Sequence, residues 1–394
     1  MADLLPAASW TQRTDLAELV AALGAENMRW VGGAVRDTLL DIEVADVDAA
    51  TKLAPGQVMA RLKAAGVSTV PTGLDHGTVT AILPRGNVEI TTLRKDVSTD
   101  GRRATIAFTS EWRDDAARRD FTINALYAHP ETREISDYFG GLEDLSHRHV
   151  RFIGDAGERI REDHLRILRY FRFQARFGAD LDEAATAACR DLASTLKGLS
   201  RERVAKEVLL LLALPAPHET LSLMAGLGVW KVILPETQAA DIARLERLVD
   251  AEQATATAPD SIRRLSALLP ALPQIVGDVG TRLRLSRNQR ARLVCNAERN
   301  ESDANAPRAL AYREGMECAL DRLLIGGADI TPLRDWEPPQ LPLKGGEIVA
   351  RGVGAGPEVA RILQAVETRW VAENFPNRQR VEQILGEILG EELA

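Results

Sequence analysis

Two aspartates separated by one residue follow a Gly-Gly turn in the segment VGGAVRDTLLDIEVADVDAAT, residues 31–51. In a strand, positions i and i+2 share a face, so Asp46 and Asp48 point at the same spot. Two carboxylates at that spacing repel each other unless a cation lies between them, and Mg²⁺ prefers such oxygen ligands. A solvated strand end is the alternative. The Gly32–Gly33 turn favours the metal site, because its N–H groups and the following helix N-terminus can approach an anion.

A third carboxylate, Glu89, lies in NVEITTLR between two apolar strand residues. The alternation places Glu89 on the face opposite Val88 and Ile90. Beside the aspartate pair it would accept the proton of an attacking hydroxyl or complete the metal coordination. An exposed strand glutamate without a catalytic role is the alternative.

Paired arginines begin the segment RRDFTINALY, residues 118–127. Arg118 and Arg119 suit triphosphate oxygens, which guanidinium groups bind through charge-assisted bidentate hydrogen bonds. Asn124 in the same segment would be a cap, a buried polar group or a sugar contact. The alternative is an ordinary basic helix start, in which the arginines pair with the neighbouring Asp114, Asp115 and Asp120.

The segment EDHLRILRYFRFQARFG, residues 162–178, repeats a charged residue at every third position. On one helix Asp163, Arg166 and Arg169 would occupy an arc of about 120°, whereas Arg172 would fall near the opposite side. Apolar and aromatic residues surround these charges, so a simple solvated face is not expected.

An acceptor beside a donor complements the base edge of cytosine and adenine, each of which offers an amino donor and a ring-nitrogen acceptor. Guanine and uracil present the reverse polarity there. Asp163 and Arg166 would therefore admit C and A and reject G and U, which would leave buried polar groups unpaired. A salt bridge between residues i and i+3 of one helix is the structural alternative.

The elements that must position these residues change in type along the chain. The first ~145 residues alternate between short strands and helices, and a polar, Gly-containing stretch at 96–104 predicts a mobile loop. Before that loop we expect strands at 28–31, around Val47, at 78–83 and at 88–93, the last two as a hairpin, with helices at 34–40 and 53–65.

From about residue 158 the hydrophobic spacing is helical throughout. We expect helices at 158–178, 200–214, 218–229, 238–252, 260–272, 286–299, 306–324, 357–375 and 378–393, with loops or linkers at 251–260 and 335–346. The fold class is therefore α+β, a small mixed-sheet head followed by an elongated helical part. The predicted domains are a catalytic head (1–147), a neck (148–215), a body (216–334) and a tail (335–394).

Composition excludes several classes of protein. With 45% hydrophobic and 27% charged residues the chain of 394 residues is of globular type, and it contains no apolar run long enough to span a membrane. A net charge of -8 argues against a general nucleic-acid coat protein but permits a local basic groove. Three scattered cysteines and histidines without metal-ligand spacing predict no disulfide, no zinc and a cytoplasmic location.

These segments resemble the bacterial tRNA nucleotidyltransferases (CCA-adding enzymes) and the related poly(A) polymerases, within the polymerase-β-like superfamily. The resemblance covers residues 29–208 and, more weakly, 341–363. The matching segments, in the family's order, are VGGAVRDTLLDIEVADVDAAT, TGLDHGTVTA, TDGRRA, RRDFTINALY, DYFGGLEDL, EDHLRILRYFRF and LSRERVAKEV.

The resemblance implies that the terminal 3′-hydroxyl of a tRNA attacks CTP or ATP, with two Mg²⁺ ions at Asp46 and Asp48. It implies that Gly32, Gly33 and Arg36 lie at the incoming nucleotide and that Arg118 and Arg119 bind its phosphates. The base would be selected by Asp163 and Arg166, with Arg169 and Arg172 nearby, and the loop 96–104 would assist the change from C to A. The helical body and tail would hold the tRNA acceptor arm.

One departure from the family is His164, where proline is common. Another observation, the single Lys52 after the paired aspartates, favours the tRNA enzyme over poly(A) polymerase, whose branch has a basic stretch there. An A-adding or CC-adding tRNA enzyme, nucleotide transfer to a small molecule and a non-catalytic tRNA-binding protein remain as alternatives. The sequence assigns no oligomeric partner.

Overall fold

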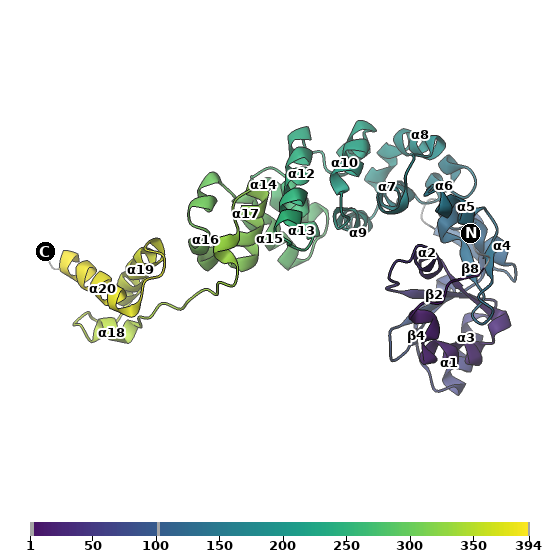
Figure 1. Ribbon diagram of the computed structural model, residues 1–394, viewed down its shortest axis with the longest axis horizontal. Helices are drawn as coiled ribbons and strands as arrows, with labels where there is room; N and C mark the ends of the chain where they lie inside the picture. Colours follow the sequence, from purple (N-terminus) through teal and green to yellow (C-terminus); the bar gives the residue numbers. More distant parts are fainter. Residues whose placement is uncertain (1–3, 101–102, 393–394) are drawn as a thin grey trace. The chain divides into compact units, whose positions relative to one another are not determined.

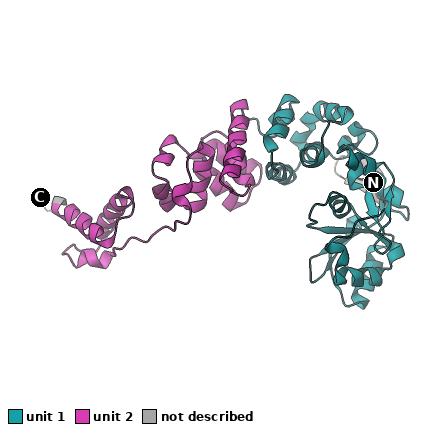
Figure 2. Cartoon of the chain, in the orientation of Figure 1, with its two compact units in different colours: residues 1–235 teal, residues 236–394 magenta. Residues whose placement is uncertain are grey.

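The computed structural model describes residues 4–100 and 103–392. The chain divides into two compact units, residues 1–235 and residues 236–394 (Figure 2). The finer division into head, neck, body and tail stays a prediction. No helix in the described ranges is long and apolar enough to cross a membrane.

A seven-stranded mixed sheet forms the first part of unit 1, with the strand order β3-β4-β5-β2-β1-β8-β9 (Figure 1). Neighbouring strands are antiparallel except for β2 and β5, which run parallel. The mixed sheet and the hairpin of β4 and β5 confirm the sequence predictions. The strands are β1 (Met28–Val31), β2 (Val47–Thr51), β3 (Ser68–Gly73), β4 (Thr78–Ile82), β5 (Val88–Thr92), β8 (Leu126–Ala128) and β9 (Ile135–Asp137).

Short helices cover this sheet. Helix α3 packs on β3 and β4 through the fully buried Val58 and Leu62, and α1 packs on α3; helix α2 packs on β1, β2 and β8. Helices α2 and α3 begin and end close to the predicted ranges 34–40 and 53–65, whereas α1, α4 and α5 were not predicted. Their bounds are α1 (Thr14–Leu23), α2 (Gly33–Leu39), α3 (Pro55–Ala64), α4 (Trp112–Ala117) and α5 (Gly141–Ser146).

The predicted loop at 96–104 is wrong in most of its length. Strands β6 (Arg94–Asp100) and β7 (Arg103–Phe108) pair antiparallel as a separate two-stranded sheet. Residues 101 and 102 of the predicted loop lie outside the described residues. A two-stranded ladder gains its hydrogen bonds from backbone groups, so it can form in a segment that shows no apolar period.

The predicted helix 158–178 is interrupted. Helix α6 (Ala156–Glu162) ends before Asp163, whose backbone is extended (φ −151°, ψ 102°), and α7 (Arg166–Phe177) begins three residues later. The Asp163 carboxylate accepts a hydrogen bond from the backbone N–H of Leu165 (3.2 Å), as short polar side chains do at turns. Asp163 therefore does not share a helix with Arg166. The remaining helices of unit 1 are α8 (Glu183–Asp191), α9 (Arg201–Leu212), α10 (Pro217–Gly226) and α11 (Val229–Ile233).

Unit 2 is helical throughout its described residues, which confirms the predicted change of type. The expected helix 306–324 is divided at Gly315, whose φ of +87° is a conformation that favours glycine. The helices are α12 (Ala239–Ala254), α13 (Ser261–Ala267), α14 (Pro273–Arg282), α15 (Arg287–Ala297), α16 (Pro307–Glu314), α17 (Met316–Gly326), α18 (Gly345–Val349), α19 (Pro357–Ala372) and α20 (Arg378–Glu392).

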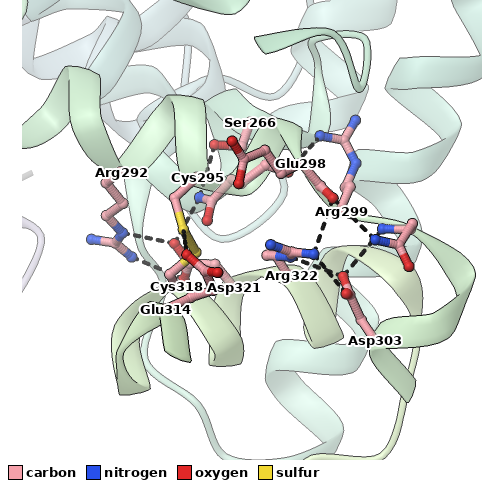
Figure 3. The surroundings of a disulfide bond; sticks show 12 residues. Ser266, Arg292, Cys295, Glu298, Arg299, Asp303, Glu314, Cys318, Asp321 and Arg322 are labelled. Atoms are coloured by element: carbon pink, nitrogen blue, oxygen red, sulfur yellow. Dashed lines mark hydrogen bonds and ion pairs between the residues drawn. A yellow bond between two sulfur atoms is a disulfide. The ribbon is translucent and has the colours of Figure 1, made fainter. Parts of the chain in front are cut away.

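The cysteines correct a further expectation. Cys295 of α15 and Cys318 of α17 form a disulfide, whereas Cys189 is free and buried (Figure 3). The two bonded residues are separated by 23 positions, and they meet because α15 packs against α17. The spacing of cysteines in the sequence does not predict this disulfide, because the contact between the two residues depends on how the helices pack.

Candidate active site

The Gly-Gly turn connects β1 to α2 at the edge of the site. Gly32 has a φ of +71°, and α2 begins at Gly33. A Cβ atom on Gly32 would lie 3.3 Å from Nη1 of Arg119, closer than an ordinary contact. The positive φ favours glycine at position 32, and the absence of a Cβ also leaves room for the Arg119 side chain.

The carboxylates lie on the strands next to this turn. Asp48 is the second residue of β2, opposite Val31 of β1 and in register with Glu89 of β5. Side chains in register on neighbouring strands point to the same face of a sheet. Asp46 precedes β2 by one residue, and all three acidic residues are exposed. Glu89 lies between the buried Val88 and Ile90, as the alternation predicted.

Desolvation and like charges both act against ionisation of Asp48. The pKa of Asp48 is raised to about 6, first by its desolvation among surrounding atoms and then by the charge of Glu89, with a smaller contribution from Asp46. Arg119 acts in the opposite direction. Although Asp48 is exposed, its ionised form is disfavoured until a cation approaches.

The donor set fits a hard divalent cation that keeps other oxygen ligands. In the ranges 4–100 and 103–392, no three His, Cys, Asp or Glu side chains converge as a complete metal site. Asp46 and Asp48 would thus hold a cation together with water or substrate phosphate oxygens, as Mg²⁺ sites at phosphates usually do.

The paired arginines are held by a buried acid. Arg118 donates to Asp115 (Nε to Oδ1, 2.8 Å), and Arg119 lies 3.5 Å from the other oxygen of the same carboxylate. Arg119 also donates to the hydroxyl of Tyr127 (3.1 Å). The predicted pairing with a neighbouring aspartate is therefore present for Asp115. The phosphate contacts stay predictions, supported by the position of Arg119 beside Gly32.

Arg36 and Asn124 are buried and bonded to each other. Arg36 donates to the side-chain oxygen of Asn124 and, through Nε, to Asp37 (2.7 Å), and its guanidinium lies 4.3 Å from the ring centre of Phe177 in α7. Burial lowers the pKa of Arg36. Of the three interpretations of Asn124, the structure presents it as a buried polar bridge, because its amide also donates to Asp120 (3.0 Å). The predicted contacts of both residues with a nucleotide stay untested.

The predicted base-selecting pair is not a salt bridge. Asp163 accepts a hydrogen bond from Arg203 of α9 (2.6 Å). Arg166 donates to Glu162 and to the backbone carbonyl oxygens of Arg159 (2.8 Å) and Arg118 (3.1 Å). The structural alternative, an ion pair between residues i and i+3 of one helix, is wrong because each residue has another partner.

Arg169 and Arg172 have structural partners on other elements. Arg169 donates to Asp120 (Nε to Oδ2, 2.7 Å), and Arg172 donates to Glu207 of α9 (Nε to Oε2, 2.6 Å). Burial acts against ionisation of Asp120, but Arg169 together with hydrogen bonds from Asn124 and the backbone N–H of Phe121 lowers the pKa of that carboxyl to about 2. Arg169 also lies 3.7 Å from Glu207. The two arginines therefore tie α7 to the head and to α9.

Arg203 and Glu207 were not among the residues predicted for this site. Glu207 lies among apolar residues of α9 and is 6% exposed, a pattern that indicates a partner of opposite charge. That signal shows that a partner exists but does not identify it.

Comparison with known proteins gives consistent matches. Residues 28–151 match the family model described as "Poly A polymerase head domain", and residues 178–241 match "Probable RNA and SrmB- binding site of polymerase A". The chain is 34% identical over 368 residues to the mitochondrial CCA tRNA nucleotidyltransferase 1 of Danio rerio, covering 88% of this chain and 84% of the relative. It is 40% identical over 235 residues to the CCA-adding enzyme of Streptococcus sanguinis, covering 59% of this chain and 57% of the relative.

Two solved structures are similar over nearly their whole length. The CCA-adding enzyme of Bacillus stearothermophilus in complex with CTP has a TM-score of 0.77 at 25% identity, covering 96% of this chain and 98% of that one. The Thermotoga maritima CCA-adding enzyme in complex with tRNA has a TM-score of 0.72 at 21% identity, covering 95% and 94%, and supports the fold.

Proposed function

The chain belongs to the family of the CCA-adding tRNA nucleotidyltransferases, and from that we propose that it adds C, C and A to the 3′ end of tRNA from CTP and ATP. The terminal 3′-oxygen of the tRNA forms a bond to the α-phosphorus of the nucleotide. The bond from that phosphorus to the oxygen bridging the α- and β-phosphates breaks, and pyrophosphate leaves. The single observation that carries this proposal is the set of like charges at Asp46, Asp48 and Glu89 beside a glycine turn and Arg119.

We propose that Asp46 and Asp48 hold two Mg²⁺ ions during the reaction. When bound, Mg²⁺ lowers the pKa of the attacking hydroxyl and offsets charge on the leaving group. Glu89 lies in register with Asp48 and is the candidate acceptor for the hydroxyl proton. Arg119 and the N–H groups of the glycine turn would orient the triphosphate.

Base selection is proposed for Asp163 and Arg166. Arg203 holds the Asp163 carboxylate, while Glu162 and two backbone carbonyls hold the Arg166 guanidinium. Both groups are thus preorganised, which lowers the cost of matching one base edge and not another. His164 lies between them, and its Nδ1 has no hydrogen-bond partner among the described residues.

The test is incorporation with single nucleotides. Purified protein is incubated with tRNA lacking its CCA end and with CTP, ATP, GTP or UTP separately, then with CTP and ATP together. We expect two additions with CTP alone and termination at CCA with both. Long A tails would identify a poly(A) polymerase, and addition of only CC or only A would identify a partial enzyme.

A substitution tests the base-selecting pair separately. In Asp163→Ala we expect GTP and UTP incorporation to rise relative to CTP and ATP, with a smaller effect on the Mg²⁺ dependence. Asp163→Asn is the matched control for side-chain size. Unchanged selectivity among the four nucleotides would contradict the proposed role.

The cytoplasmic location also stays a proposal. Two of the three cysteines are bonded to each other, which a reducing compartment does not favour, and several relatives carry mitochondrial names. Fractionation of the source cells, followed by the incorporation assay on each fraction, tests the location directly.

A further inference from the structure

A cavity of about 630 Å³ in unit 2 is lined by arginines from separate elements. Arg244 and Arg247 belong to α12, Arg299 follows α15, and Arg322 belongs to α17. The acidic residues of the lining are Glu301 and Asp303. The cavity wall is therefore positive within a chain whose net charge is -8.

Two of these arginines already have carboxylate partners. Arg322 is bonded to both oxygens of Asp303 (2.9 and 2.6 Å), and Arg244 lies 2.8 Å from Asp241. These pairs neutralise their own charges. They leave Arg247 and Arg299, neither of which has an ion pair among the described residues.

Arg299 is oriented without being neutralised. It donates to the backbone carbonyl oxygens of Asn296 (3.0 Å) and Leu269 (2.7 Å). Burial and the nearby charge of Arg244 lower the pKa of Arg299 to about 10. In Figure 3 the Arg322 side chain points toward Asp303, whereas the guanidinium of Arg299 points away from that carboxylate. A half-buried cation held in this way has N–H groups left for an anion.

The lining also indicates which kind of anion would fit. It contains no aromatic side chain on which a base could stack. A phosphodiester needs only guanidinium donors and a positive field, and an acidic protein requires such local groups to bind RNA at all.

We propose that Arg247 and Arg299 bind a phosphodiester group of the RNA substrate at this cavity. The inference rests on the proposed function, because it assigns a contact for the macromolecule that the active site would extend. Arg247 is exposed and Arg299 half-buried, so one arginine would capture the backbone and the other would fix its position.

The test measures RNA affinity and nucleotide affinity separately. Binding of labelled tRNA lacking CCA is followed by fluorescence anisotropy at several salt concentrations, and the KM for CTP is measured by incorporation. In Arg299→Gln and in Arg247→Gln we expect the tRNA affinity to fall roughly tenfold, as for loss of a charged hydrogen bond. The slope of log affinity against log salt should become shallower by about one per arginine. The KM for CTP should not change.

Two control variants and a second test variant make the result decisive. Lys63→Gln removes an exposed cation on α3 of unit 1, outside the cavity, and should leave tRNA affinity unchanged. Arg299→Lys retains the charge and should recover part of the affinity. Arg247→Gln changes an exposed side chain, so it keeps the test valid even if Arg299→Gln unfolds.

Two outcomes would overturn the proposal: unchanged tRNA affinity and salt slope in Arg247→Gln, or a rise in the KM for CTP in place of a loss of RNA affinity. Failure of the proposed function is a separate result. It would appear as absent incorporation by the unsubstituted protein, while anisotropy would still report RNA binding.

Discussion

Two groups of carboxylates in this protein differ in how their charges are compensated. Asp321 in unit 2 is fully buried and accepts hydrogen bonds from Arg263 (2.8 Å), Arg292 (2.7 and 3.0 Å) and Asn296 (2.8 Å). At the central strands of the unit 1 sheet, Asp46 and Asp48 have no ion pair within the described chain, and Glu89 is in register with Asp48. A carboxylate with satisfied oxygens stabilises a fold, whereas grouped carboxylates without such partners fit the proposed cation site.

The region around α7 lies between these two cases. Asp120 and Glu207 are buried and paired with Arg169 and Arg172, yet these pairs lie beside the residues proposed to select the base. Paired charges in that place hold the proposed site in position. Carboxylates whose charge is paired with an arginine of the protein are therefore interpreted as supporting residues, and those without such a pair as candidates for ligand binding.

The largest expected effect is that of Asp48→Asn on catalysis. Loss of a cation ligand should lower the incorporation rate about 10³-fold, equivalent to ~4 kcal/mol of transition-state stabilisation. The thermal unfolding midpoint should not fall, because Asp48 has no stabilising partner to lose. Asp46→Asn should behave in the same way. Retained incorporation in either variant would contradict the cation site.

Asp321→Asn should have the opposite profile. It removes a negative charge that Arg263 and Arg292 share, while Glu252 still pairs with Arg263 and Asp260 with Arg292. We therefore expect the free energy of unfolding to fall by about 3 kcal/mol. Urea denaturation measures this change. Asp250→Asn, an exposed change on α12, is the matched control and should leave the midpoint unmoved. An unchanged midpoint in Asp321→Asn would refute the structural role of this carboxylate.

Removal of the disulfide should affect the same unit and spare the chemistry. The bond closes a loop of 23 residues, for which the loss of chain entropy predicts about 3 kcal/mol of stabilisation. Cys318→Ser should therefore unfold at lower urea while incorporation at low temperature is retained. A reductant should destabilise the unsubstituted protein and leave Cys318→Ser unaffected; equal sensitivity of both would show that the bond does not form.

The smallest expected effect concerns the pKa of Asp48. In the metal-free protein its carboxyl should titrate at about 6, and Glu89→Gln should lower that pKa by removing a like charge. Because the pKa in the folded protein exceeds the ordinary aspartate value of 3.8, this group favours folding below pH 3.8, and the contribution is lost as the pH rises through 6. Carbon-13 NMR titration measures the shift, with the exposed Glu43→Gln as control. If the pKa of Asp48 is the same in Glu89→Gln as in the unsubstituted protein, the charge of Glu89 does not act on Asp48.

Much of the fold was predictable from local patterns. Alternation around Val88 and Ile90 located β5, and apolar spacing located α3, because burial of one face imposes a period on the sequence. The hairpin of β6 and β7 and the break before α7 were not predictable in this way. Backbone hydrogen bonds and a turn at Asp163 determine them, and neither requires an apolar period.

The sequence by itself determined which residues are candidates for the chemistry, since residue type and spacing place Asp46, Asp48 and the glycine turn in one short segment, residues 31–51. Tertiary structure decided which charges are compensated. Asp163 meets Arg203 across 40 positions and Asp120 meets Arg169 across 49. An ion pair depends on distance in space, and only the packing of α7, α9 and the sheet establishes that distance.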